Sequence, residues 1–349
     1  MYLERLSVVR LGPFDKLDVE FLDREYSPRM MTVVYGEGGI GKTTFLAALT
    51  CTRPGHLVVP RGLFRRPGGG SWASASWRIT EEDRTGSYSM ELVTPNAGPS
   101  APTIEAAQRR VQVLIERRAA SGRGCVYIAV PGQRQFPRAS LGLIDPARTM
   151  LHYDVRTAGI AAESSRPELT RACKQAISYA GIVSALVGNR RGDESDPRFL
   201  GAAMSEAIGE MVGLADYGYV GVDPLSLEPM FVSPGGSRLG FEGLPSQLRH
   251  LVSFVAIPTR NLWAAYGGRD PRECEAVVAI DDVQLRLSEG VMQGVLAALR
   301  RALPRVQWIL ATSSPLLASR CDPDELVTLR RLPNSDRVEL FTGDLARSH

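Results

Sequence analysis

The feature that most constrains this chain is the glycine-rich segment Gly36–Thr43, which reads GEGGIGKT. It matches the phosphate-binding loop pattern G-x-x-x-x-G-K followed by Ser or Thr at every fixed position. Residues 31–35 before it are apolar and predict a buried strand, and residues 44–49 after it predict the start of a helix. Such a turn lets backbone N–H groups surround phosphates at the positive end of the helix dipole. The alternative is an ordinary glycine-rich turn that binds nothing.

This loop supplies most of the predicted nucleotide contacts. Lys42 is expected to reach the β- and γ-phosphates and is a candidate catalytic residue, and the Thr43 hydroxyl is expected to ligate Mg²⁺. The predicted nucleotide-binding residues of the loop are Gly36, Glu37, Gly38, Gly39, Ile40, Gly41, Lys42, Thr43 and Thr44.

A pair of aspartates follows a second apolar stretch. Residues 276–280 are all apolar, predict a buried strand, and lead directly into Asp281 and Asp282. An acidic residue at the carboxyl end of a strand beside the phosphate loop can hold Mg²⁺, often through water, which makes Asp281 a predicted metal ligand. The neighbouring carboxylate, Asp282, is then placed to polarise the attacking water. The alternative is that both aspartates only cap the following loop.

Composition narrows the remaining possibilities. The 349 residues are 44% hydrophobic and 23% charged, which is enough for one large domain or two lobes. A net charge of +3 does not indicate a dedicated nucleic-acid binder. Only three of the 41 basic residues are lysines, which favours a GC-rich genome over a demand for bidentate phosphate recognition by arginine. The scattered cysteines and histidines do not predict a zinc site. Without a signal peptide or an apolar span, we expect a cytoplasmic protein with no membrane partner.

The order of apolar patterns predicts an α/β fold. A β-hairpin over 4–21 precedes the phosphate-loop strand. We also expect strands at 73–80, 87–93, 125–130, 276–280, 306–312, 326–330 and 338–341, and helices at 104–119, 169–186, 197–214 and 287–303. Residues 1–155 and 251–349 are predicted to form the core lobe, with an inserted helical lobe at 156–250. Trp263 and Tyr266 are expected to pack in the core.

On these motifs the chain resembles the RecF/SMC-type branch of ABC ATPases, especially the compact heads of the OLD family and other bacterial defence ATPases. The resemblance runs through the whole chain in order. Its landmarks are the hairpin 6–21, the phosphate loop, Gln133 or Gln135 at the metal-sensing glutamine loop, 241–251 at the signature loop, Asp281-Asp282, and 312–315 at the switch segment. It implies a P-loop NTPase with a mixed sheet, an antiparallel N-terminal sheet, and ATP and Mg²⁺ as ligands. It also implies that Gln133 contacts the metal and that Ser313 contacts the nucleotide.

Three departures from the family pattern point to slow hydrolysis. Asp282 stands where the family usually has glutamate, Ser313 stands where it has histidine, and Ser246 is followed by glutamine where it has glycine. Losing a well-placed catalytic group costs roughly 10²–10⁴ in rate. ATP binding is expected to persist because Lys42 and Thr43 are present.

The resemblance implies a head that dimerises around two ATP molecules, or forms a higher oligomer. Ser246 would then cap the nucleotide of the partner head, and Arg249 would restore some of the lost positive charge; for Ser246 the alternative is a plain helix N-cap. We expect a regulatory ATPase that controls an effector protein or a DNA transaction, in a setting such as antiphage defence. Without a coiled-coil arm or nuclease domain, the effector chemistry is expected to lie on a partner chain.

Three alternatives remain open at this stage. One is an active, DNA-stimulated RecF-like ATPase, for which the basic loop 61–70 is a candidate contact, although a solvated loop is the simpler interpretation, as it is for 189–191. Another is a structural subunit with permanently bound ATP. A small-molecule kinase would need an acceptor pocket that no motif indicates.

Overall fold

A six-stranded sheet forms the centre of the computed structural model. The structure describes residues 1–54, 70–80, 86–94, 110, 113–114, 117–118, 124–141, 169–187, 196, 198–333, 335 and 337–347. The strand order is β13-β12-β3-β11-β10-β6, and every neighbouring pair is parallel except β12 and β13. The strands are β3 (Met31–Tyr35), β6 (Val126–Val130), β10 (Ala276–Ile280), β11 (Val306–Thr312), β12 (Leu326–Arg331) and β13 (Val338–Thr342).

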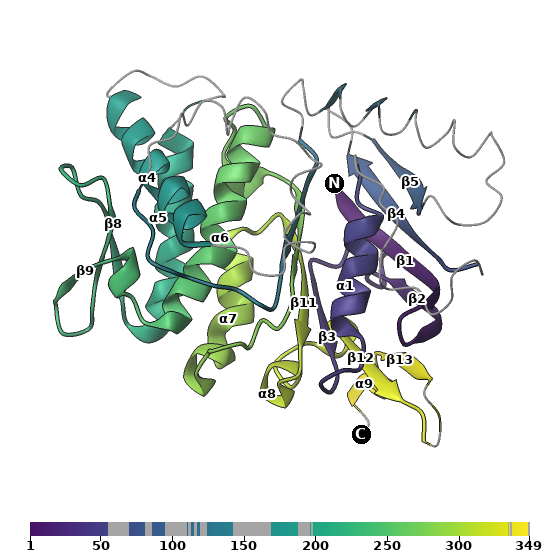
Figure 1. The fold of residues 1–349 in the computed structure, drawn as a ribbon. Helices are drawn as coiled ribbons and strands as arrows, with labels where there is room; N and C mark the ends of the chain where they lie inside the picture. Colours follow the sequence, from purple (N-terminus) through teal and green to yellow (C-terminus); the bar gives the residue numbers. More distant parts are fainter. Residues whose placement is uncertain are drawn as a thin grey trace.

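Both faces of β6 and β10 are buried, which explains why these two strands are apolar throughout. Along β10, Val278 and Ile280 contribute to one hydrophobic core, while Val277 and Ala279 contribute to the other. The first core contains α4 (Leu169–Val187), α5 (Arg198–Val212), α6 (Ser246–Ala265) and α7 (Glu289–Ala302). The second contains α1 (Lys42–Cys51) and the N-terminal sheet (Figure 1). The arrangement is therefore layered, with the central sheet between the helices and the N-terminal sheet.

The N-terminal sheet is antiparallel, as the sequence predicts. Its order is β2-β1-β4-β5, formed by β1 (Tyr2–Leu11), β2 (Phe14–Glu20), β4 (Trp72–Thr80) and β5 (Ser87–Val93). Gly12 has φ 52° at the hairpin turn, where a glycine pays no steric penalty. Shorter elements complete the described fold: α8 (Pro315–Ala318), α9 (Asp344–Arg347), and the 3₁₀ turns η2 (Gly213–Ala215), η3 (Phe241–Gly243), η4 (Pro271–Glu273) and η5 (Pro323–Glu325).

The predicted helical lobe needs one correction. Between α5 and α6 the chain forms a small antiparallel sheet of β7 (Gly218–Val222), β8 (Pro229–Val232) and β9 (Arg238–Gly240), on the left of Figure 1. These strands are three to five residues long, so their alternation is too short to stand out from the polar turns that join them. The boundary predicted at residue 250 lies inside α6.

Other predictions for this region have mixed outcomes. Trp263 and Tyr266 pack against the core, as expected. The helix predicted at 104–119 is described only at 110, 113–114 and 117–118, which are helical. Residues 61–69 and 189–191, from the two arginine-containing loops, lie outside the described residues.

Candidate functional site

The predicted site residues gather at the carboxyl edge of the parallel strands. The loop that contains Gly36 follows β3, Asp281 and Asp282 follow β10, Ser313 follows β11, and Gln133 lies in the segment after β6. Ligands of open parallel sheets bind at this edge, because the loops that leave neighbouring strands converge there. The strand order has one unexpected feature, since β11 separates β10 from β3.

The backbone of the glycine-rich loop leaves room for a ligand at Gly38 and Gly39. Gly39 has φ 76° and Gly41, which directly precedes α1, has φ 113°, both in the region that favours glycine. A Cβ at Gly41 would overlap the ring of Pro13, so the loop packs closely against the N-terminal hairpin. In contrast, a Cβ at Gly38 or Gly39 would meet nothing within 4 Å. The loop therefore packs against the N-terminal hairpin at Gly41, while its surface at Gly38 and Gly39 is left uncovered.

Lys42 lies across this loop rather than in solvent. Its residue is 6% exposed, and its Nζ donates to the carbonyl oxygens of Gly36 and Glu37, both at 2.9 Å. An ammonium group has three donors, so one remains for a phosphate oxygen. These two carbonyls hold the ammonium at the mouth of the loop.

Thr43 and Asp281 meet although 238 positions separate them. Thr43 Oγ1 donates to Asp281 Oδ2 at 2.7 Å. Burial raises the pKa of Asp281 above its usual value, the Thr43 hydrogen bond opposes this, and the nearby Asp282 carboxylate adds to it. A hydroxyl and a carboxylate oxygen are the hard ligands that Mg²⁺ prefers, so this pair fits the predicted metal site.

Asp282 adopts a left-handed backbone conformation, with φ 45°. Aspartate tolerates this conformation better than most residues. A Cβ at Gly132 would lie 3.0 Å from Asp282 Oδ2 and 3.3 Å from Asp281 Oδ2, so both carboxylates crowd the backbone after β6. Gln133 and Gln135, on either side of a buried residue of this segment, are exposed. The structure therefore brings the backbone at Gly132, the residue before Gln133, against the aspartates.

The residue between the two glutamines, Arg134, was missed at the sequence level. It is 6% exposed, and its Nη1 donates to the carbonyl oxygen of Asp281 at 2.6 Å while Nη2 donates to that of Asp282 at 2.9 Å. Its Nε donates to His250 Nδ1 of α6 at 2.9 Å. Burial lowers the pKa of Arg134 to about 10, which still leaves it charged at pH 7. Arg134 thus connects the aspartate pair to α6.

The start of α6 excludes one sequence-level alternative. The N-cap residue is Pro245, and Ser246 is the first helical residue, so Ser246 is not the cap. Gln247 Oε1 accepts from the backbone N–H of Ser288 at 3.2 Å, which ties this turn to the segment after the aspartates. Arg249 lies over the ring of Phe136 at 5.9 Å. The Arg249 side chain therefore packs on the segment after β6.

Ser313 is joined to Asp282 by a side chain that the sequence pattern did not single out. Gln284 Nε2 donates to Ser313 Oγ at 3.0 Å and to Asp282 Oδ1 at 3.1 Å. The ends of β10 and β11 are therefore linked through one amide.

Comparison with solved structures identifies the fold. An Smc head bound to the C-winged helix domain of ScpA is 13% identical, with a TM-score of 0.50 over 100% of both chains. An Smc head domain with an extended coiled coil bound to the C-terminal domain of ScpA, from Pyrococcus furiosus, is also 13% identical, with a TM-score of 0.50 over 98% of this chain and 96% of that one. The chain has the fold of an SMC head domain.

Other comparisons set the limits of this likeness. The SMC head domain from Thermotoga maritima matches at 13% identity and a TM-score of 0.48, over 99% of this chain and 100% of that one. No protein-family model and no curated protein matches the sequence. At such low identity the likeness concerns the fold alone. The predicted mixed α/β fold and its likeness to the fold of an SMC head are confirmed, and the likeness to OLD proteins stays a prediction.

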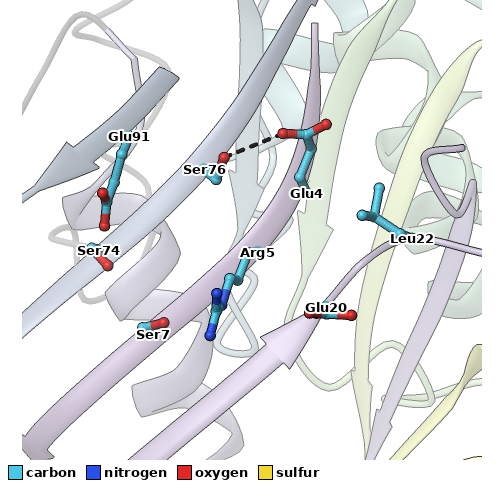
Figure 2. Close-up of a pocket in the computed structure, with 8 residues that line it drawn as sticks. All are labelled: Glu4, Arg5, Ser7, Glu20, Leu22, Ser74, Ser76 and Glu91. Carbon is cyan, nitrogen blue, oxygen red and sulfur yellow. Dashed lines mark hydrogen bonds between the residues drawn. The ribbon is translucent and has the colours of Figure 1, made fainter. Parts of the chain in front are cut away.

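A separate cavity of about 310 Å³ lies on the N-terminal sheet (Figure 2). Among the described residues that line it are Glu4, Glu20 and Glu91 but only one basic residue, Arg5, whose guanidinium pairs with Asp18. This lining repels phosphate rather than attracting it. Among the described helices, none is long and apolar enough to cross a membrane.

His250 predicts a pH dependence of stability. Burial, together with Arg134, Arg286 and Arg249, lowers its pKa to about 3. Below pH 6.5, the ordinary pKa of histidine, His250 binds a proton in the unfolded chain but stays neutral in the folded chain. The free energy of unfolding therefore falls as the pH falls. We expect this group alone to cost about 2 kcal/mol between pH 7 and pH 5.

Urea unfolding of the wild type and of His250→Gln at both pH values measures this effect. Glutamine can still accept from Arg134 but does not titrate. The difference in unfolding free energy between the two proteins should shrink by about 2 kcal/mol on going from pH 7 to pH 5. A difference that stays constant over this range would show that His250 takes up its proton in the folded state.

Proposed function

We propose that this chain is an ATP-binding regulatory head that assembles on ATP·Mg²⁺, hydrolyses it slowly, and controls a partner protein or a DNA transaction. The observation that carries the proposal is the hydrogen bond from Thr43 to Asp281 beside the Lys42 ammonium. This contact joins the two motifs that the chemistry requires. Lys42 and the loop N–H groups would bind the phosphates, and Thr43 with Asp281 would hold Mg²⁺, which neutralises charge on the phosphate oxygens.

Slow hydrolysis is supported by the surroundings of Asp282. Its carboxylate is one methylene shorter than glutamate, and Oδ1 is already engaged by Gln284. The carboxylate also lies against Gly132, which limits its movement toward a bound nucleotide. A base that cannot reach the attacking water contributes little to the rate.

The proposed assembly of two heads around ATP is supported by the fold and by the position of Ser246. The Ser246 side chain is partly exposed on the first turn of a 20-residue helix, where free N–H groups favour an anion. We propose that it contacts the nucleotide held by a second copy of the chain. An effector on a partner chain and a role in antiphage defence remain part of the proposal.

The assembly is tested by light scattering with ATP·Mg²⁺, with ADP·Mg²⁺ and without nucleotide. We expect the mass to double only with ATP. Ser246→Arg should abolish the doubling while ATP still binds, because a long side chain would block the approach of the second head. Ser89→Arg, at an exposed position on β5, is the matched control and should assemble normally.

Three outcomes would point to a different function. A mass that ATP does not change would rule out the nucleotide-driven dimer. Nucleotide that copurifies and never exchanges would favour a structural subunit. ATP hydrolysis that DNA stimulates, with salt-sensitive DNA binding, would favour the RecF-like alternative.

A further inference from the structure

Gln284 occupies the junction between the aspartate pair and the segment after β11. Its Nε2 lies 3.1 Å from Asp282 Oδ1 and 3.0 Å from Ser313 Oγ, and its Oε1 lies 2.8 Å from Thr312 Oγ1. One side chain therefore contacts two candidate site residues and the buried end of the strand that separates β3 from β10.

The chemistry of these neighbours fixes the direction of each hydrogen bond. A carboxylate only accepts, so the amide nitrogen of Gln284 must face Asp282. Thr312 Oγ1 accepts from the backbone N–H of Ser314 at 3.0 Å and gives its own proton to Gln284 Oε1. The two amide hydrogens of Gln284 then go to Asp282 and Ser313, and the amide cannot flip without placing two acceptors together.

This direction decides what Ser313 can do. Its oxygen accepts from Gln284, and within the described part of the chain Ser313 donates its hydroxyl hydrogen to no other group. A hydroxyl has a single hydrogen, and that of Ser313 is free to be donated on the exposed side of the site. The backbone N–H of Gly36, at the start of the phosphate loop, donates to the carbonyl oxygen of Thr312, so Ser313 directly follows a contact with that loop. In the proposed ATP site, the Ser313 hydrogen would be donated to an oxygen of the terminal phosphate.

We propose that Gln284 is the residue that makes the site distinguish ATP from ADP. It does so by keeping Ser313 as a donor toward the terminal phosphate and by holding Asp282 beside it. This inference rests on the proposed function. Ser313 contacts the nucleotide directly, and Gln284 acts through Ser313 as a positioning residue.

The experiment measures equilibrium affinities for ATP·Mg²⁺ and ADP·Mg²⁺ with four variants. Gln284→Glu offers Ser313 an acceptor in place of a donor and repels Asp282, so the Ser313 hydrogen turns away from the phosphate. ATP affinity should fall about ten- to a hundredfold, and ADP affinity should stay within about twofold. Gln284→Met, which keeps the length but has no donor, should weaken ATP binding less. Ser313→Ala should also weaken only ATP binding, and the double variant Gln284→Met with Ser313→Ala should lose no more than Ser313→Ala alone.

Each outcome separates this inference from the function on which it rests. If the wild type does not bind ATP, the proposed function fails. If the wild type binds ATP and the Gln284 variants weaken ATP and ADP equally, Gln284 only supports the fold and the inference is wrong. The inference is also wrong if the effects of Gln284→Met and Ser313→Ala simply add. Melting curves identify any variant that does not fold. If Gln284→Glu does not fold, the affinities of Gln284→Met for ATP and ADP test the inference instead.

Discussion

Replacement of Lys42 by alanine is expected to weaken ATP binding by about 100-fold or more. The Lys42 ammonium is buried at the mouth of the loop and is held by the carbonyl oxygens of Gly36 and Glu37. Each hydrogen bond that involves a charged group contributes about 1.5–3 kcal/mol, and each 1.4 kcal/mol corresponds to a tenfold change in affinity. Losing the ammonium also removes the positive charge that the loop itself would offer to the negative phosphates. Titration calorimetry with ATP·Mg²⁺ measures the change.

Lys16→Ala is the matched control for this prediction. Lys16 is an exposed lysine on β2, so its removal makes the same change of net charge outside the site. We expect its ATP affinity to equal that of the wild type. If Lys42→Ala also binds ATP normally, the loop around Lys42 is a structural turn and the nucleotide site lies elsewhere.

Replacement of Arg134 by alanine is expected to destabilise the fold by about 3 kcal/mol or more. Its guanidinium donates to the carbonyl oxygens of Pro131, Asp281 and Asp282 and to His250. Removing it leaves buried acceptors without donors, and each such group costs about 1–3 kcal/mol. The positive φ of Asp282 would also lose the contact that holds its carbonyl in place. The free energy of unfolding in urea measures this effect.

Arg138→Ala controls for the loss of an arginine from the same segment. Arg138 is exposed, and its substitution should change the unfolding free energy by less than about 0.5 kcal/mol. If Arg134→Ala is as stable as Arg138→Ala, the buried hydrogen bonds of Arg134 contribute nothing net. In that case the aspartate pair must be positioned by its own strand.

The parts of the fold that were predictable are those with long, uniform patterns. The strands β5 and β11 were predicted to the residue, because an apolar or alternating run ends at a clear turn signal. The phosphate loop was predictable because its spacing is a geometric requirement rather than a preference. Its contact with Asp281 was predictable only in outline, since the sequence does not give the strand order.

The parts that were missed depend on contacts distant in sequence. In a chain whose basic residues are almost all arginines, nothing in the sequence marks Arg134 as a buried arginine. Gln284 belongs to no sequence motif, and it can contact Ser313 only because β10 and β11 are neighbours in the sheet. The assignment of Ser246 as a possible N-cap failed because Pro245 is the N-cap and Ser246 is already the first residue of the helix. The type of a residue limits the hydrogen bonds it can make, but its neighbours in the folded chain determine which of them it makes.

Single-turnover hydrolysis of ATP by the wild type and by Asp282→Glu tests the central claim most directly. With protein in excess over radiolabelled ATP·Mg²⁺, we expect the wild type to bind ATP and to cleave it roughly 10²-fold or more slowly than Asp282→Glu, whose longer carboxylate reaches the attacking water. Equal or faster cleavage by the wild type, abolished in Asp282→Ala, would contradict this claim. Asp282 would then be a sufficient base, and this chain would be an ordinary ATPase rather than a head that assembles on ATP and hydrolyses it slowly.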